Sequence, residues 1–282
     1  MTPTLPRRLA RIRPRDPQAP DEQFFAANDA LDFESEEGKR WTIIGTPFPN
    51  SRANAASPAR PGWEPGTVVD QAEFSFLAPS VPANVLGMAH NTGQPGRDLP
   101  PQAFHKAATS VIGPDEAIRL TPTVGYVDPE AELTVVVGRT ARALTLETAR
   151  SAILGFTIGN DVSARDLQKT DELWISAKSQ DTFTPAGPWI VTDLDDSDLE
   201  IGIVHNGKEL RSASSADLGW KVDEIMVYLT SFMTLHPGDI ILTGFPAECA
   251  RIEPGDVVEC RVAGIGALRN PVAGAAWEDP AG

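Results

Sequence analysis

Two glutamates stand two residues apart at the entrance to an apolar strand. Glu130 and Glu132 belong to the sequence YVDPEAELTVVVG (residues 126–138), whose second half is β-branched and apolar. Side chains alternate between the two faces of a strand, so both carboxylates point to one face and Ala131 to the other. Two like charges this close raise each other's pKa unless a cation or hydrogen-bond donors compensate. The pattern fits either a solvated strand edge or a divalent cation with oxygen ligands.

A third carboxylate follows another strand-like run. Asp161 comes soon after Gly159 in the sequence GNDVSARD, at a place where a short side chain can point into a cleft. Oxygen ligands from several segments are what hard cations such as Mg²⁺ require. Asp161 is therefore the candidate third ligand beside the two glutamates.

Composition limits the partners that this chain can have. The chain has 282 residues and a formal net charge of -15, so it lacks the basic surface that nucleic acids require. No apolar run approaches the ~20 residues of a membrane span, and the basic N-terminal segment has no apolar signal core. The two cysteines, Cys249 and Cys260, have no metal-type spacing and predict reduced thiols. These features predict a cytoplasmic protein with no nucleic-acid or membrane partner.

Strand signals dominate the chain from about residue 85 onward. Residues 145–159 instead predict a helix, with Thr145 as its N-cap and apolar residues at helical spacing. The run FTIGNDVSARD (residues 156–166), which overlaps the end of this segment, predicts a strand that leads into a loop. Residues 221–235 predict a second, amphipathic helix. Its apolar face is predicted to consist of Val222, Ile225, Met226, Leu229 and Phe232. The dipeptide Asn206-Gly207 predicts a tight hairpin.

These signals together predict a mainly β fold with a few packed helices. Residues 1–82 are rich in Pro, Ala and Gly with only short strand-like pieces, so they predict a small irregular N-terminal domain. Residues 83–282 form the main domain in this interpretation.

Five segments resemble the fumarylacetoacetate hydrolase family, in the order found in that family. They read PEAELTVVVGR, GFTIGNDVSARDLQ, AKSQDTFTPAGPWIVT, FMTLHPGDIILTG and GIGALRNPV. The resemblance implies a mixed β-sheet roll, a homodimer, and Mg²⁺ or Mn²⁺ held by Glu130, Glu132 and Asp161. It also implies a 2-oxo or 2,4-dioxo acid as substrate, which members of the family hydrolyse, decarboxylate or isomerise.

The resemblance extends to residues beside the metal ligands. Lys178 matches the family's active-site lysine, which would hold the substrate's carboxylate or stabilise developing negative charge. Gln168 is expected to reach the substrate. Arg165 is a further substrate-binding candidate, with an ion pair to Asp166 as the alternative.

The segment before Lys106 departs from the family pattern. Hydrolytic and decarboxylating members carry a His and a Glu there that activate water. This chain reads GMAHNTGQPGRDLPPQAFHKAATSVIG (residues 87–113), which is shorter and has no H-x-x-E between residues 87 and 100. His90 is the candidate catalytic replacement, although a packing or capping role explains it equally well. Asp98 and Lys106 are further candidates.

A second departure lies in the sequence LTGFPAE, where the family commonly has Thr at the position of Phe245. Phenylalanine cannot donate the hydrogen bond that such a Thr gives to the substrate's carboxylate, and its ring would make the pocket smaller and more apolar. Both departures weigh against acylpyruvate hydrolysis. The sequence thus predicts a metal-dependent enzyme on a 2-oxo acid or its enol, with decarboxylation or isomerisation favoured. The alternative is a binding protein that retains the metal and a small acid but has lost turnover.

Overall fold

The structure, a computed structural model, describes residues 7–16, 21–58, 60–92 and 100–275. Its first strands are β1 (Arg8–Pro14), β2 (Phe24–Asn28), β3 (Arg40–Ile44), β4 (Val68–Asp70), β5 (Phe74–Phe76), β6 (Val85–Met88), β7 (Ala103–Lys106), β8 (Val111–Ile112), β9 (Ile118–Leu120) and β10 (Val127–Asp128). Then follow β11 (Ala131–Val137), β12 (Ile153–Asn160), β13 (Ser163–Ala164), β14 (Thr184–Val191), β15 (Glu200–His205), β16 (Lys208–Glu209), β17 (Ala213–Ser214), β18 (Ile240–Leu242), β19 (Val257–Val262) and β20 (Gly266–Gly274).

Helices are short and few by comparison. The α-helices are α1 (Arg165–Gln168), α2 (Ile175–Lys178) and α3 (Val222–Phe232), and the 3₁₀ turns are η1 (Gln71–Glu73), η2 (Ala108–Ser110), η3 (Ala149–Ala152) and η4 (Ser215–Asp217). The protein is therefore mainly β with a few helices, as the sequence predicts. No helix of the described residues is long and apolar enough to cross a membrane.

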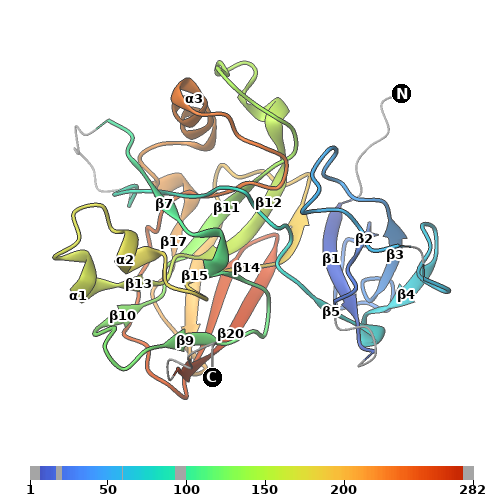
Figure 1. The fold of residues 1–282 in the computed structure, drawn as a ribbon, viewed down its shortest axis with the longest axis horizontal. Coiled ribbons are helices and arrows are strands. Elements are labelled where there is room, and N and C mark those ends of the chain that lie inside the picture. The colour runs from blue at the N-terminus through green and yellow to red at the C-terminus, as the bar shows by residue number, and fades with distance from the viewer. Residues whose placement is uncertain (1–6, 17–20, 59, 93–99, 276–282) are drawn as a thin grey trace, which may run out of the picture.

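Most strands join one large mixed sheet. Its order is β4-β3-β2-β1-β14-β12-β11-β18-β6-β7, with β5 on β1 and β8 on β14. The N-terminal strands, blue in Figure 1, thus continue the sheet that holds β11 and β12, through the pairing of β1 with β14. The division into a small N-terminal domain at residues 1–82 and a main domain at residues 83–282 stays a prediction. A second sheet has the order β16-β15-β19-β20-β9, with β17 on β15.

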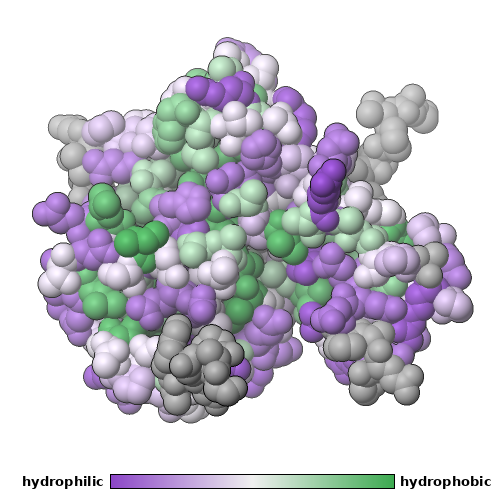
Figure 2. Space-filling model, in the orientation of Figure 1, coloured by the Kyte–Doolittle hydropathy of each residue, from purple (hydrophilic) through white to green (hydrophobic). Residues whose placement is uncertain are grey.

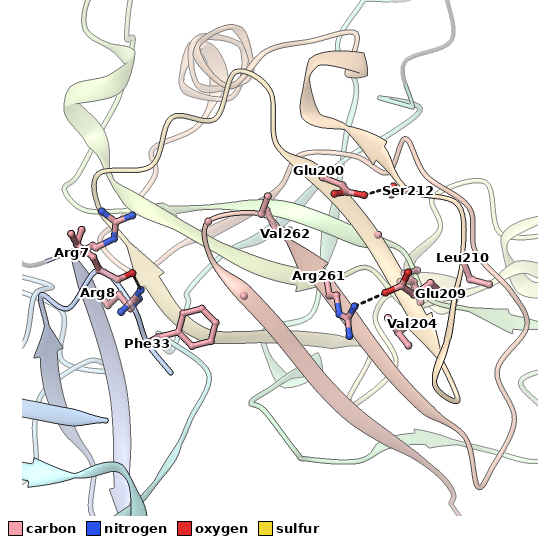
Figure 3. Close-up of a pocket in the computed structure, with 16 residues that line it drawn as sticks. Arg7, Arg8, Phe33, Glu200, Val204, Glu209, Leu210, Ser212, Arg261 and Val262 are labelled. Atoms are coloured by element: carbon pink, nitrogen blue, oxygen red, sulfur yellow. Dashed lines mark hydrogen bonds and ion pairs between the residues drawn. The ribbon is translucent and has the colours of Figure 1, made fainter. Parts of the chain in front are cut away.

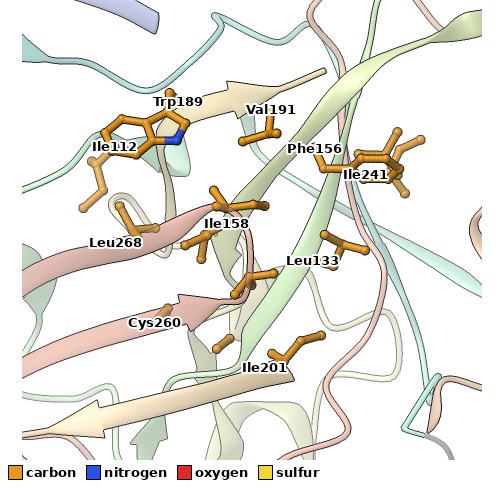
Figure 4. Packing of buried hydrophobic residues seen from close by; sticks show 14 of the residues in the cluster. Ile112, Leu133, Phe156, Ile158, Trp189, Val191, Ile201, Ile241, Cys260 and Leu268 are labelled. Carbon is orange, nitrogen blue, oxygen red and sulfur yellow. The ribbon is translucent and has the colours of Figure 1, made fainter. Parts of the chain in front are cut away.

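The core lies between these two sheets. Figure 4 shows Leu133 and Ile158 from the large sheet facing Ile201, Cys260 and Leu268 from the second sheet. All five side chains are almost completely buried. Both cysteines are free thiols, as predicted. Because β11 and β12 lie at the centre of the large sheet, the ends of these two strands are held rigidly.

The helix predicted at residues 145–159 is wrong, whereas the strand predicted from residue 156 is confirmed as part of β12. The N–H of Thr145 donates to the Thr148 hydroxyl in a turn, η3 follows, and the apolar run becomes β12. The second predicted helix is confirmed as α3, which buries Val222, Ile225, Met226 and Leu229. Phe232 does not join this face: 54% of it is exposed, and its ring packs against Tyr228 instead. The predicted hairpin is confirmed by the positive φ of both turn residues, Asn206 and Gly207.

Candidate metal centre

The pairing of β11 with β12 brings the candidate ligands together. These strands are antiparallel with Ala131 opposite Asn160, so the start of one lies beside the end of the other. The Asp161 N–H donates to the Glu130 carbonyl at 2.9 Å, which fixes the two chain segments. One carboxylate oxygen each of Glu130, Glu132 and Asp161 lies within 4.8 Å of the other two. The structure thus places three carboxylates at one point, as the sequence predicts.

Two lysines hold Asp161 from opposite oxygens. Lys106 at the end of β7 approaches Oδ1 at 2.5 Å, and Lys178 at the end of α2 bonds to Oδ2. Lys178 also bonds to Glu130 Oε2 at 2.9 Å and donates to the Ser163 hydroxyl at 2.6 Å. Both lysine side chains are almost completely buried. Lys106 and Lys178 therefore belong to the charged centre and are not surface residues.

Arg165, at the start of α1, forms ion pairs with two carboxylates of the centre. Its guanidinium pairs with Asp128 Oδ1 at 2.7 Å and with Glu130 Oε1 at 2.9 Å. The expected alternative, an Arg165–Asp166 ion pair, is not what the structure has, because Asp166 pairs with Lys169 and accepts the Tyr126 N–H. Arg165 also donates to the Gln168 side chain at 3.0 Å, which places that amide beside the centre. Substrate contact by Arg165 or Gln168 stays a prediction.

The backbone after β18 holds Glu132. The Gly244 N–H donates to Glu132 Oε2 at 2.6 Å. Gly244 has a φ of 117°, and a Cβ on it would lie 2.2 Å from the Asn91 carbonyl oxygen, so only glycine fits. Asn91 is itself buried and donates to the carbonyls of Thr243 and Trp220. This network orients Glu132 without giving it a counter-charge.

The centre has one more carboxylate than it has cations. Four carboxylates and three cations meet among the described residues: Asp128, Glu130, Glu132 and Asp161 with Lys106, Lys178 and Arg165. Within the described part of the chain, Glu132 forms no ion pair. The excess negative charge is buried, where an uncompensated charge is costly.

The pKa values reflect this imbalance. Burial raises the pKa of Glu132 well above its ordinary value, and the neighbouring Asp161 and Glu130 raise it further. Burial acts on Glu130 in the same direction, but Lys178 and Arg165 outweigh it and lower the pKa of Glu130 to about 2. The deficit of positive charge is thus concentrated at Glu132.

A divalent cation fits this set of donors. The spacing of the three carboxylate oxygens suits an ion with oxygen ligands at about 2.0–2.6 Å. Each carboxylate oxygen has two lone pairs, so the hydrogen bonds described above leave acceptor capacity for an ion. Glu130, Glu132 and Asp161 would hold the cation, and its charge would compensate the buried excess.

The other predicted residues lie around the centre in different environments. His90 is exposed, and its ring packs edge to face on Trp174 with 5.1 Å between ring centroids. Phe245 is 6% exposed and packs within the hydrophobic core. A catalytic role for His90 and a substrate contact for Phe245 stay predictions. Asp98 lies outside the described residues.

Sequence reasoning missed Asp128, Ser163 and the Gly244 N–H. Asp128 continues the alternation of Glu130 and Glu132, so the spacing D-x-E-x-E is a signal that could have found it. Ser163 donates to Glu130 Oε2 at 3.0 Å, but a serine in a loop carries no comparable sequence signal. A backbone donor such as the Gly244 N–H can be identified only from the structure, where β18 pairs with β11.

A cavity of about 520 Å³ lies elsewhere, between the N-terminal part and strands β15 and β19. Figure 3 shows Arg7, Arg8 and Phe33 on one side of it and Arg261 on the other. Its lining includes none of the three clustered carboxylates. Its arginines bind groups of the protein itself: Arg261 pairs with Glu209 at 2.9 Å, and Arg8 donates to a backbone carbonyl at 2.8 Å. This cavity therefore does not contribute to the candidate metal centre.

Comparison with known proteins gives consistent matches. Residues 80–273 match the family model described as fumarylacetoacetate (FAA) hydrolase C-terminal. The mitochondrial oxaloacetate tautomerase FAHD2A of Bos taurus is 34% identical over 224 residues, 73% of this chain and 71% of the relative.

Solved structures extend the match to almost the whole chain. A 5-carboxymethyl-2-hydroxymuconate delta-isomerase from Mycobacterium smegmatis superposes with a TM-score of 0.82 at 35% identity, over 95% of this chain and 100% of that chain. A 2-hydroxyhepta-2,4-diene-1,7-dioate isomerase from Mycobacterium marinum gives a TM-score of 0.79 at 36% identity, over 95% and 98% of the two chains.

Proposed function

The chain belongs to the fumarylacetoacetate hydrolase family, and we propose that it is a divalent-metal-dependent enzyme that interconverts the keto and enol forms of a 2-oxo acid. The observation that carries this proposal is a buried centre of three carboxylates, held by lysines, in a chain without an H-x-x-E pair between residues 87 and 100. Isomerisation needs no activated water at the carbonyl, whereas hydrolysis of a C–C bond does. Two similar structures named as isomerases and a relative named as a tautomerase support the same choice.

The chain's own residues would perform three tasks in this reaction. Glu130, Glu132 and Asp161 would hold Mg²⁺ or Mn²⁺, which would supply Lewis acidity for the reaction of a 2-oxo acid. Lys178 and Arg165 fix the orientation of Glu130, and the Gly244 N–H fixes that of Glu132. The Lys178 ammonium would also place positive charge beside oxygens that become negative during enolisation.

The test compares the three reactions on one protein sample with Mg²⁺, with Mn²⁺ and with EDTA. Loss of the enol absorbance of oxaloacetate follows tautomerisation, release of pyruvate from oxaloacetate follows decarboxylation, and loss of an acylpyruvate follows hydrolysis. We expect metal-dependent acceleration of the first reaction well above the other two. Lys178→Met should lower it at least ~100-fold, whereas Lys169→Met, which changes an exposed lysine at the C-terminal end of α1, should leave it unchanged.

Two results would contradict the proposal. Faster acylpyruvate cleavage than tautomerisation would make the protein a hydrolase despite the missing dyad. Metal-dependent binding of 2-oxo acids with no turnover of any of them would instead support a binding protein. Thermal unfolding of Lys178→Met shows whether its loss of activity reflects the missing ammonium or a loss of folded protein.

A further inference from the structure

A row of aromatic rings leads from the charged centre to the surface. The Phe104 ring lies 4.8 Å from the Lys178 ammonium, and its centroid lies 5.7 Å from that of Trp174. Trp174 in turn contacts His90 at 5.1 Å. Exposure increases along this row, from the buried Lys178 through the partly buried Phe104 and Trp174 to the exposed His90. We call Phe104, Trp174 and His90 the aromatic row.

Local backbone structure places each ring. Gly87 in β6 lies opposite Phe104 in β7, and a Cβ on Gly87 would lie 2.2 Å from the Phe104 ring, so the outer end of the ring packs directly against that glycine. Trp174 immediately precedes α2, and its carbonyl accepts the Lys178 N–H at 2.9 Å. One helical turn therefore links the tryptophan to the lysine of the centre.

The surroundings of the aromatic row are apolar or negative. Leu173 and Ile175 flank Trp174 and are 82% and 52% exposed. Figure 2 shows hydrophobic surface over the region that Figure 1 labels α1 and α2. Asp171 and Glu172 precede these residues, so the same loop carries two carboxylates. The Lys178 ammonium is already bound to Glu130 and Asp161, so it is not free to pair with a charged group that lies along the row.

We propose that the aromatic row binds the tail of the substrate, the part beyond its 2-oxo acid head, and that it selects a flat, uncharged tail such as an aryl or conjugated alkenyl group. This inference rests on the proposed function, because the centre must hold the head. Flat tails stack on aromatic rings, whereas a tail that ends in a carboxylate would be repelled by the like charges of Asp171 and Glu172 in the same loop. The preference would differ from the dioate substrate in the name of the Mycobacterium marinum structure. His90 then contributes to substrate selection through its contact with Trp174.

The test measures binding by calorimetry in the presence of Mg²⁺ with three probes: oxalate as the head alone, oxaloacetate as a head with a charged tail, and phenylpyruvate as a head with an aryl tail. We expect wild-type protein to bind phenylpyruvate about 10-fold more tightly than oxaloacetate. Trp174→Ala should weaken phenylpyruvate binding about 5- to 10-fold and leave oxalate binding unchanged. Trp174→Phe should retain most of the affinity, and the control Lys169→Met, at an exposed residue outside the aromatic row, should bind all three acids as wild type does.

The outcomes separate this inference from the proposed function. Equal weakening of oxalate and phenylpyruvate in Trp174→Ala would give Trp174 a structural role only and overturn the inference. Tighter binding of oxaloacetate than of phenylpyruvate by wild-type protein would overturn it as well, while head binding survives. Wild-type protein that binds none of the three acids with Mg²⁺ present would overturn the inference together with the proposed function.

Discussion

Replacing Gly244 by alanine tests how the fold orients the candidate ligand Glu132. A Cβ at this position would lie 2.2 Å from the Asn91 carbonyl oxygen, whereas ordinary contact begins at 3.4 Å, so one backbone segment must move by 3.4 − 2.2 = 1.2 Å. The obstacle is a backbone atom of a residue held by hydrogen bonds to Thr243 and Trp220, so it cannot rotate away. The movement would displace the Gly244 N–H from Glu132.

A matched control separates steric displacement from backbone strain. Gly255 has a φ of 102°, close to the 117° of Gly244, but a Cβ there would meet nothing within 4 Å. Alanine at a positive φ costs about 1 kcal/mol of folding free energy at either site. At Gly244 the forced backbone shift adds about 1–3 kcal/mol.

The two variants should therefore differ in both stability and metal binding. Gly244→Ala should lower Tm by about 4–16 °C and Gly255→Ala by about 2–4 °C, measured by thermal unfolding. Loss of an orienting hydrogen bond should also weaken Mg²⁺ binding about 10- to 100-fold in Gly244→Ala, whereas Gly255→Ala binds as wild type. Equal Tm values and equal Mg²⁺ affinities for the two variants would refute this account of Glu132.

Three further predictions concern charge, packing and pH. Glu132→Gln should weaken Mg²⁺ binding, measured by calorimetry, at least ~100-fold. In EDTA its Tm should equal or exceed that of wild type, because the variant removes a buried carboxylate that has no ion-pair partner among the described residues. A large drop of Tm in EDTA would contradict the count of charges at the centre. Leu133→Ala, in the core of β11, should cost about 2–5 kcal/mol of unfolding free energy in denaturant titration, and Leu146→Ala, which is 59% exposed, less than ~0.5 kcal/mol. Partial burial alone would raise the pKa of Asp256, but hydrogen bonds from Asn206, the Glu253 N–H and His205 outweigh it and lower this pKa. A lowered pKa of a carboxyl group stabilises the folded protein at pH values above the ordinary pKa of 3.8, and this stabilisation is lost as the pH falls further. The Tm difference between wild type and Asp256→Asn should therefore be present at about pH 6 and shrink below about pH 4. A Tm difference that grows on acidification would contradict this sign.

Most strands were predictable because their signals are local. Apolar, β-branched runs bounded by Gly and Pro identify β11, β14 and β18 without knowledge of their partners. The run at residues 153–160 is predicted only in part: a strand is expected from residue 156, but the apolar spacing of the run also suits the helix that is expected up to residue 159. Pairing with β11 on one side and β14 on the other makes it a strand, and such long-range pairing overrides local periodicity.

The three candidate ligands of the centre were predictable from the sequence, because they lie on or next to strands with clear local signals. The lysines and the arginine around them were harder to predict. Glu130 and Glu132 are two residues apart, and Asp161 ends the neighbouring strand. Lys106 contacts Asp161 although it lies 55 residues earlier in the chain, and no local sequence pattern predicts this contact. Family resemblance identified Lys178, but its double contact with Glu130 and Asp161 needed the structure.

The carboxylates of the centre lie at the ends of strands, whereas Trp174 and His90 lie outside regular strands, and this difference affects how substrate selectivity can change. The carboxylates stand at the ends of two central strands, so a change of position there would disturb the core of the large sheet. Trp174 and His90 lie outside regular strands, both with positive φ, and their rings contact each other. Substitution of such loop residues changes the shape of a site with little effect on the fold. A centre that holds the acid head can therefore stay unchanged while the aromatic row sets which tail is accepted, and head binding and tail binding should respond to separate mutations.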